Sequence, residues 1–224
     1  MTHKQPLTWK AFQKENLSIM VEEYIKDNIL KGVFKGGDRL IETDIAEELG
    51  ISRGPVREGI KAVAQTGIIT LESRRGAYVT KFDEESIQEL FEIRLLLETS
   101  IFEDIIRNEK VSESDIGVLE ALVEEMIEIA HDGELDQETA MLAVNKKDIE
   151  FHQYIWRMSS SLRKEKILNE HFFQLRIAML YDTKATENLL KTATDHFAII
   201  NFLREGDINS CRQALIDHIE TYSA

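Results

Sequence analysis

The amino-acid sequence predicts a mostly α-helical protein in two parts: two short helices with a β-hairpin, and then an antiparallel six-helix bundle. Three observations lead to this prediction. A glycine turn joins two short amphipathic segments within residues 42–60, and no proline interrupts the helical periodicity after residue 84. The charge also changes sign: residues 1–82 carry 13 Lys and Arg against 11 Asp and Glu (+2), whereas the remainder carries 14 against 30 (−16).

These patterns divide the chain into an arm at 1–16, a first domain at 17–80, a linker at 81–83 and an all-helical domain at 84–224. The arm is expected because its residues are polar and mixed. No apolar run approaches the ~18 residues that a membrane span requires, and the N-terminus lacks a signal-peptide core. A single cysteine, Cys211, excludes an intramolecular disulfide. We therefore expect a cytoplasmic protein with no membrane partner.

The first domain contains the pattern of a helix-turn-helix. Five apolar residues are spaced so that two helices share one small core: Ile45, Leu49, Ile51, Val56 and Ile60. Gly50 suits the positive φ of a tight turn between helices. Ser52 is a good N-cap for the second helix, and Pro55 falls in that helix's first turn, where a missing N–H costs little.

A basic hairpin follows the second helix. Residues 68–71 and 77–80 read as strands, and the turn between them includes Arg74, Arg75 and Gly76. Helices and hairpin together predict a winged helix-turn-helix. Arg53 and Arg57 lie four residues apart at the N-terminal end of the second helix, where arginine can read guanine edges.

Duplex DNA is thus the expected partner of the first domain, and the acidic remainder would repel it. A surface helix pair with ordinary exposed arginines is the alternative. Turn, cap, spacing and wing together disfavour that alternative.

The remaining chain predicts six helices joined by short turns, at residues 84–108, 113–131, 135–159, 161–181, 186–205 and 207–222. Asp83, Ser112 and Asp207 are expected N-caps, and Gly133 and Gly206 lie at breaks.

Four polar residues of this bundle fall on faces that are otherwise apolar: Asp148, His152, His196 and His218. The first two are one turn apart on the third bundle helix, and the others belong to the fifth and sixth. Three imidazoles and a carboxylate form a ligand set suited to Zn²⁺, Ni²⁺, Mn²⁺ or Fe²⁺. Hydrogen-bonded core histidines are the alternative. One metal would satisfy all four groups, each of which costs ~1–3 kcal/mol when buried and unpaired.

Arg94 and His171 are further candidates, for binding a small-molecule effector. Arg94 and Glu98 both fall on the inward face of the first bundle helix, either as a buried ion pair or with Arg94 clamping an effector carboxylate. His171 is also expected to point inward, either as a core residue or as a pocket residue.

The chain resembles the GntR-type bacterial transcription regulators, in the FadR-like branch with an FCD effector domain. The N-terminal resemblance covers about residues 17–80, with the motifs Gly37-Asp-Arg-Leu40, Ile45-Ala-Glu47, Leu49-Gly50, Ser52-Arg53, Pro55-Val-Arg-Glu58 and Arg75-Gly-Ala-Tyr-Val79. The C-terminal resemblance covers about residues 84–222, with Arg94-x-x-x-Glu98, Asp148-x-x-Phe151-His152, Asp195-His196 and His218-Ile219.

This resemblance implies a homodimeric repressor that binds a palindromic operator in double-stranded DNA and responds to a small organic acid. It implies that the aspartate and three histidines hold a divalent metal, with zinc expected in the purified protein, whose coordination the acid completes. It also implies that Arg53 and Arg57 read bases, while Thr43, Ser52 and Gly76 approach the backbone or a groove, beside the wing residue Arg75. Gly54 and Gly59 depart from the family pattern, and Gly59 should soften the second helix.

Two other functions fit the metal set: a metalloenzyme fused to a DNA-binding head, and a regulator that senses the metal directly. A nucleophile motif such as Gly-x-Ser-x-Gly is absent. We therefore expect a regulator and not an enzyme.

Overall fold

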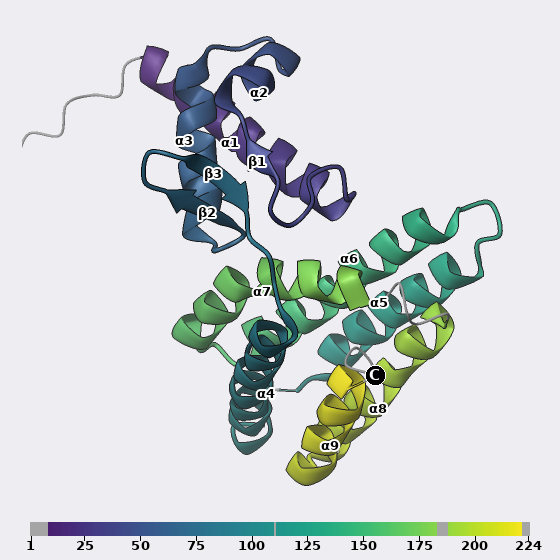
Figure 1. The fold of residues 1–224 in the computed structure, drawn as a ribbon. Helices are drawn as coiled ribbons and strands as arrows, with labels where there is room; N and C mark the ends of the chain where they lie inside the picture. Colours follow the sequence, from purple (N-terminus) through teal and green to yellow (C-terminus); the bar gives the residue numbers. More distant parts are fainter. Residues whose placement is uncertain (1–8, 110, 183–187, 221–224) are drawn as a thin grey trace, which may run out of the picture. The chain divides into compact units, whose positions relative to one another are not determined.

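The computed structural model describes residues 9–109, 111–182 and 188–220 (Figure 1). The chain forms two compact units, Met1–Phe82 and Asp83–Ala224. Residues 1–8 of the expected arm lie outside the described residues. Within the described residues, no helix combines the length and the apolar character needed to cross a bilayer.

The first unit is a winged helix-turn-helix, as predicted (Figure 1). Its elements are α1 (Trp9–Leu30), β1 (Arg39–Leu40), α2 (Glu42–Glu48), α3 (Arg53–Gln65), β2 (Ile69–Glu72) and β3 (Gly76–Val79). The three strands form an antiparallel sheet in the order β1-β3-β2. Its core is made of apolar side chains from every helix and from the hairpin: Val21, Ile25, Ile45, Val56, Ile60, Val63, Ile69 and Val79.

The turn between α2 and α3 depends on Gly50, whose φ of 65° is the positive value expected for it. Ser52 occupies the N-cap position of α3 with an extended backbone, but its side chain makes no capping hydrogen bond. The expected capping bond is therefore absent, although the helix begins where the sequence predicts.

Helix α1 begins at Trp9, so residues 9–16 are helical and not part of a loose arm. This helix packs closely against α3 at Gly59. A Cβ atom at position 59 would lie 2.6 Å from Cγ1 of Val21 and 2.9 Å from the carbonyl oxygen of Ser18. Gly59 is buried and permits this close approach, so its role is packing between helices.

The described part of the second unit contains the six predicted helices: α4 (Glu84–Arg107), α5 (Glu113–His131), α6 (Gln137–Met158), α7 (Leu162–Asp182), α8 (Leu189–Glu205) and α9 (Ile208–Glu220). Their ends differ from the predicted ones by up to three residues. Helix α5 packs on α6 and α8, α9 on α4 and α8, and α7 on α4 and α6. This network brings α4, α6, α8 and α9 around one core.

The predicted caps of this unit are present. Asp83 accepts a hydrogen bond from the Ser86 backbone N–H (2.9 Å), and Ser112 forms a capping box with Asp115. Asp207 accepts from Ser210 at the start of α9, and Gly206 ends α8 with a φ of 73°. These local signals fix where each helix starts, and hence which residues face the core.

Candidate functional site

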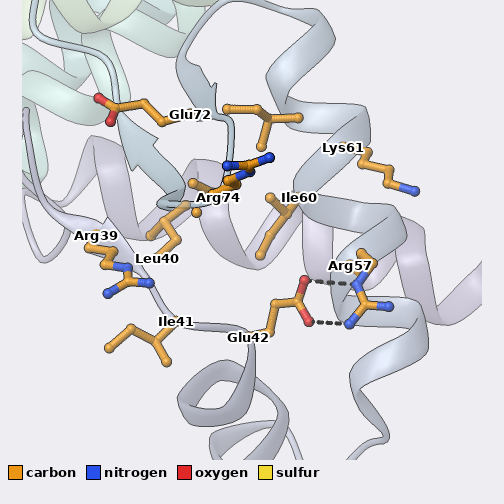
Figure 2. Close-up of a pocket in the computed structure, with 12 residues that line it drawn as sticks. Arg39, Leu40, Ile41, Glu42, Arg57, Ile60, Lys61, Glu72 and Arg74 are labelled. Carbon is orange, nitrogen blue, oxygen red and sulfur yellow. Dashed lines mark hydrogen bonds and ion pairs between the residues drawn. The ribbon is translucent and has the colours of Figure 1, made fainter.

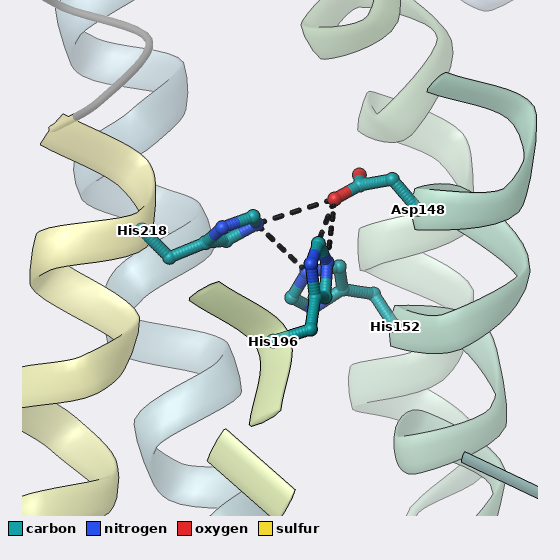
Figure 3. A group of neighbouring side chains, drawn as sticks. All are labelled: Asp148, His152, His196 and His218. Carbon is teal, nitrogen blue, oxygen red and sulfur yellow. Dashed lines mark hydrogen bonds and ion pairs between the residues drawn. The ribbon is translucent and has the colours of Figure 1, made fainter. Parts of the chain in front are cut away.

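Four polar side chains meet in the core of the second unit (Figure 3). Asp148 and His152 come from α6, His196 from α8 and His218 from α9. One ligand atom from each lies within 4.8 Å of the others, and each side chain is at most 1% exposed. The inward faces predicted from periodicity therefore meet at one point.

One oxygen of Asp148 is the centre of this group. Its Oδ1 lies 2.8 Å from Nε2 of His196, 3.2 Å from Nε2 of His218 and 3.8 Å from Nε2 of His152. The Nε2 atoms of His152 and His218 are 3.2 Å apart. All three rings thus present the same nitrogen to the same carboxylate oxygen (Figure 3).

The outer nitrogens of two rings fix their tautomers. Nδ1 of His196 lies 2.9 Å from the carbonyl oxygen of Thr192, which can only accept a hydrogen bond. Nδ1 of His152 lies 2.9 Å from Oε2 of Glu98. Each Nδ1 therefore donates, and in a neutral ring this leaves the Nε2 lone pair facing the Asp148 oxygen.

A nitrogen lone pair and a carboxylate oxygen that face each other repel each other, and a cation between them removes this repulsion. Hydrogen bonds from Nδ1, like those of His196 and His152, are also the contacts that orient metal-bound histidines in proteins. The donor set therefore fits a divalent ion.

The charges around the group agree with this fit. Burial alone would raise the pKa of Glu98, but Arg94 and His152 outweigh it and lower that pKa to about 2. Burial lowers the pKa of His152, and it lowers that of His218 to about 3. At neutral pH Glu98 is therefore ionised, and the rings of His152 and His218 are neutral.

Helix α4 joins the group through a chain of buried contacts. Arg94 Nε donates to Glu98 Oε1 (2.7 Å), and Glu98 Oε2 accepts from His152. Both side chains are fully buried, and the Arg94 guanidinium carbon lies 5.9 Å from the Phe172 ring centroid. The buried ion pair between Arg94 and Glu98, one of the two arrangements expected from the sequence, is present. The contact with His152 was not foreseen, because the rotation of α4 relative to α6 cannot be read from spacing.

His171 does not join this group. It is partly exposed on α7, and its Nδ1 donates to the carbonyl oxygen of Ile167 on its own helix (2.9 Å). Ile167 is itself 40% exposed, so this face of α7 lies at the surface. The expected inward orientation of His171 is therefore not observed.

The candidate DNA-binding residues of the first unit are all exposed: Thr43, Ser52, Arg53, Arg57, Arg75 and Gly76. Arg53 and Arg57 lie in the first turns of α3, and the Thr43 hydroxyl donates to Asp44 (3.0 Å). In the wing, Arg75 lies 3.3 Å from Glu72, and Gly76 has a φ of 116°. None of these side chains is needed for the apolar core.

A groove of about 470 Å³ lies beside α3, between that helix and the wing (Figure 2). Its charged lining has four basic residues, Arg39, Arg57, Lys61 and Arg74, and two acidic ones, Glu42 and Glu72. Arg39 was not among the candidates because β1 is only two residues long and gives no periodic signal. Glu42 holds Arg57 by two hydrogen bonds, Nε to Oε1 (2.9 Å) and Nη2 to Oε2 (2.7 Å).

Each of the two units matches a known protein family. Residues 17–79 match the model of the bacterial regulatory proteins of the gntR family, and residues 89–221 match the FCD domain. The uncharacterized HTH-type transcriptional regulator YdhC of Bacillus subtilis is 27% identical over 198 residues, covering 87% of this chain and 84% of that protein. The gluconate operon transcriptional repressor of the same organism is 38% identical over 102 residues, which is 46% of this chain and 41% of the repressor.

The solved structure of E. coli McbR/YncC has a TM-score of 0.74 at 21% identity, covering 92% of this chain and 94% of that one. At this identity it supports the fold alone. The FCD match spans more than half of this chain. The chain therefore belongs to the GntR family of DNA-binding transcription regulators, in the branch with an FCD domain, and is not an enzyme.

Proposed function

We propose that the protein is a homodimeric repressor that senses a small organic acid through a divalent metal held by Asp148, His152, His196 and His218. The observation that carries this proposal is the Asp148 oxygen facing two fixed Nε2 lone pairs, with the third Nε2 beside them. A buried set of this kind has a strong electrostatic preference for a cation.

Four protein ligands suit Zn²⁺, Ni²⁺, Mn²⁺ or Fe²⁺, and zinc is the ion we expect in the purified protein. When bound, such an ion supplies a Lewis-acidic centre to which a carboxylate oxygen can coordinate. Arg94 is the proposed second contact of the acid, because it brings a buried positive charge to the same core through Glu98 and His152.

The arrangement also supports a route for the signal. The four ligands tie α6, α8 and α9 together, and the Glu98–His152 contact adds α4, the helix that follows the linker at residues 81–83. A ligand that changes the packing of these helices would change the spacing of the two DNA-reading domains in a dimer. Because operator half-sites lie ~34–36 Å apart, a small change in spacing opposes paired binding.

In this proposal Arg53 and Arg57 read base edges, and Thr43, Ser52, Arg75 and Gly76 approach the backbone or a groove of a palindromic operator. The exposure of all six residues supports this assignment. The direction of control, repression, is supported by the name of the related gluconate operon repressor.

The double variant Asp148→Ala/His196→Ala tests the proposal. It should lose the bound metal and the response to acid, while the DNA contacts of the first unit stay intact. The matched control is His131→Ala/Asp132→Ala, which removes the same two residue types from an exposed helix end. Metal content and DNA release are measured for both proteins. Unchanged metal content and response in the first variant would refute the proposal, and DNA affinity that follows the metal without any acid would identify a direct metal sensor.

A further inference from the structure

The pair between Glu42 and Arg57 differs from the other ion pairs of the first unit. Several other ion pairs among its described residues join residues only three or four apart, such as Lys61 with Glu58. Glu42 and Arg57 are 15 residues apart and join the start of α2 to α3 (Figure 2). The pair therefore links two elements of the reading surface, by which we mean the exposed face that carries Thr43, Ser52, Arg53 and Arg57.

The geometry uses only one side of the guanidinium. Arginine has five N–H donors in a rigid plane, and a carboxylate can occupy the edge formed by Nε and Nη2. Glu42 takes that edge, with distances of 2.9 and 2.7 Å. The second edge, formed by Nη1 and Nη2, keeps donors for another planar acceptor pair. Guanine O6 and N7 are such a pair.

Glu42 is also held in place better than Arg57. It lies two residues after the buried Leu40 of β1 and three residues before the buried Ile45 of α2, so its backbone is anchored on both sides. The Arg57 side chain is 54% exposed and would otherwise sample many rotamers. A side chain that is fixed before binding loses less freedom when it binds.

We propose that Glu42 is a positioning residue that sets the base preference of this regulator, by holding Arg57 with its second guanidinium edge turned toward the DNA. This inference rests on the proposed base-reading role of Arg57. The hydrogen bond from Arg57 also lowers the pKa of Glu42, which keeps the carboxylate ionised.

The negative charge of Glu42 gives the pair a second consequence. Near DNA it opposes sequence-independent attraction, which is electrostatic. Glu42 therefore strengthens discrimination in two ways, through the orientation of Arg57 and through weaker non-specific binding. An inhibitory latch would act differently, because Arg57 would have to leave Glu42 before it could bind DNA.

The test uses the full chain and a library of randomised duplex DNA, from which the protein selects its preferred sites. Four proteins are compared: wild type, Arg57→Ala, Glu42→Ala and the control Glu47→Ala. Glu47 is an exposed carboxylate on the same helix, so its removal changes the charge of α2 by the same amount. Affinity for one mixed-sequence duplex is measured in parallel, and thermal unfolding checks that each variant is folded.

We expect Arg57→Ala to erase the preference at one base position in each half-site. At that position Glu42→Ala should reduce the preference about tenfold, within the range that a bidentate arginine contributes. Non-specific affinity should rise in both glutamate variants, while Glu47→Ala keeps the wild-type preference.

Three results would overturn the inference. If Arg57→Ala loses a preference that Glu42→Ala retains, Arg57 reads the base without help from Glu42. If Glu42→Ala binds preferred sites more tightly with unchanged preference, the pair is a latch. If Arg57→Ala itself keeps every preference, the base-reading role of Arg57 is wrong, and the metal-dependent response to acid is still tested separately by the second unit's variants.

Discussion

The two units place their polar side chains in opposite environments. In the first unit, Arg57 and Arg75 are 54% and 76% exposed, and the core beneath them is apolar. In the second unit, Asp148, His152 and His196 are fully buried and contact one another. Substitutions on the reading surface should therefore change DNA binding with little effect on stability. Substitutions in this buried group, the proposed metal site, should change stability and ligand binding together.

The largest expected effect is that of Glu98→Gln in the second unit. It removes the buried charge that pairs with Arg94 and orients His152. Unfolding free energy should fall by about 3–5 kcal/mol, and metal affinity by about 10–100-fold. Denaturant titration and metal competition measure the two effects.

Glu103→Gln is the matched control for this change, because Glu103 forms an exposed pair with Arg107 on the same helix. It should lose less than about 1 kcal/mol. Equal losses in the two variants would remove the distinction between a buried and an exposed pair.

Arg57→Ala in the first unit should weaken operator binding by about 1–3 kcal/mol and relax base preference. Because the side chain is exposed, unfolding free energy should change by no more than about 0.5 kcal/mol. Binding to selected and random duplexes, with parallel denaturation, measures both. A loss of affinity that is the same for every sequence would show that Arg57 contacts phosphate and not a base.

Gly59→Ala tests where the first unit does depend on close packing. The added Cβ would lie within 3 Å of Val21 and of the Ser18 backbone, so we expect a loss of about 1–3 kcal/mol. This loss should outweigh the gain of about 1 kcal/mol in helix propensity.

Gly54→Ala in the same helix is the control, since no atom lies within 4 Å of its Cβ position. It should be neutral or stabilising. Thermal unfolding compares the stabilities of the two variants with that of the wild type. A stabilised Gly59→Ala protein would contradict the packing of α1 on α3.

The last prediction leaves the sequence unchanged and concerns Cys211, which is buried in α9. Burial, with Asp207 and Glu205, raises the pKa of its thiol to about 12, so the folded protein holds much less thiolate than an exposed cysteine would. A thiol reagent at pH 8 should react slowly with the folded protein and rapidly after unfolding. Since the chain has one cysteine, the signal is unambiguous. Rapid reaction of the folded protein would show that the core of the second unit opens locally.

The sequence predicts much of this structure because the relevant signals are local. Caps such as Ser112 and the positive φ of Gly50 depend on a few neighbouring residues. Periodicity placed Asp148 and His152 on one face of α6, and the same reasoning applied to His196 and His218.

What the sequence did not predict depends on contacts between elements. Spacing does not give the rotation of α4 against α6, so the Glu98–His152 contact was missed. The pair of Glu42 with Arg57 spans 15 residues, and β1 has too few residues to show a period. His171 was placed inward by a periodicity that the neighbouring exposed Ile167 does not follow.

The central claim is that an organic acid binds this protein through a metal held by Asp148 and the three histidines. A thermal-shift screen of the metal-loaded protein against small mono-, di- and tricarboxylates and sugar acids tests it most directly. The screen is repeated after chelation and with Asp148→Ala/His196→Ala. We predict that at least one acid raises the melting temperature by several degrees in the metal-loaded protein alone. The same stabilisation after chelation and in the double variant, or no stabilisation by any acid, would contradict the claim.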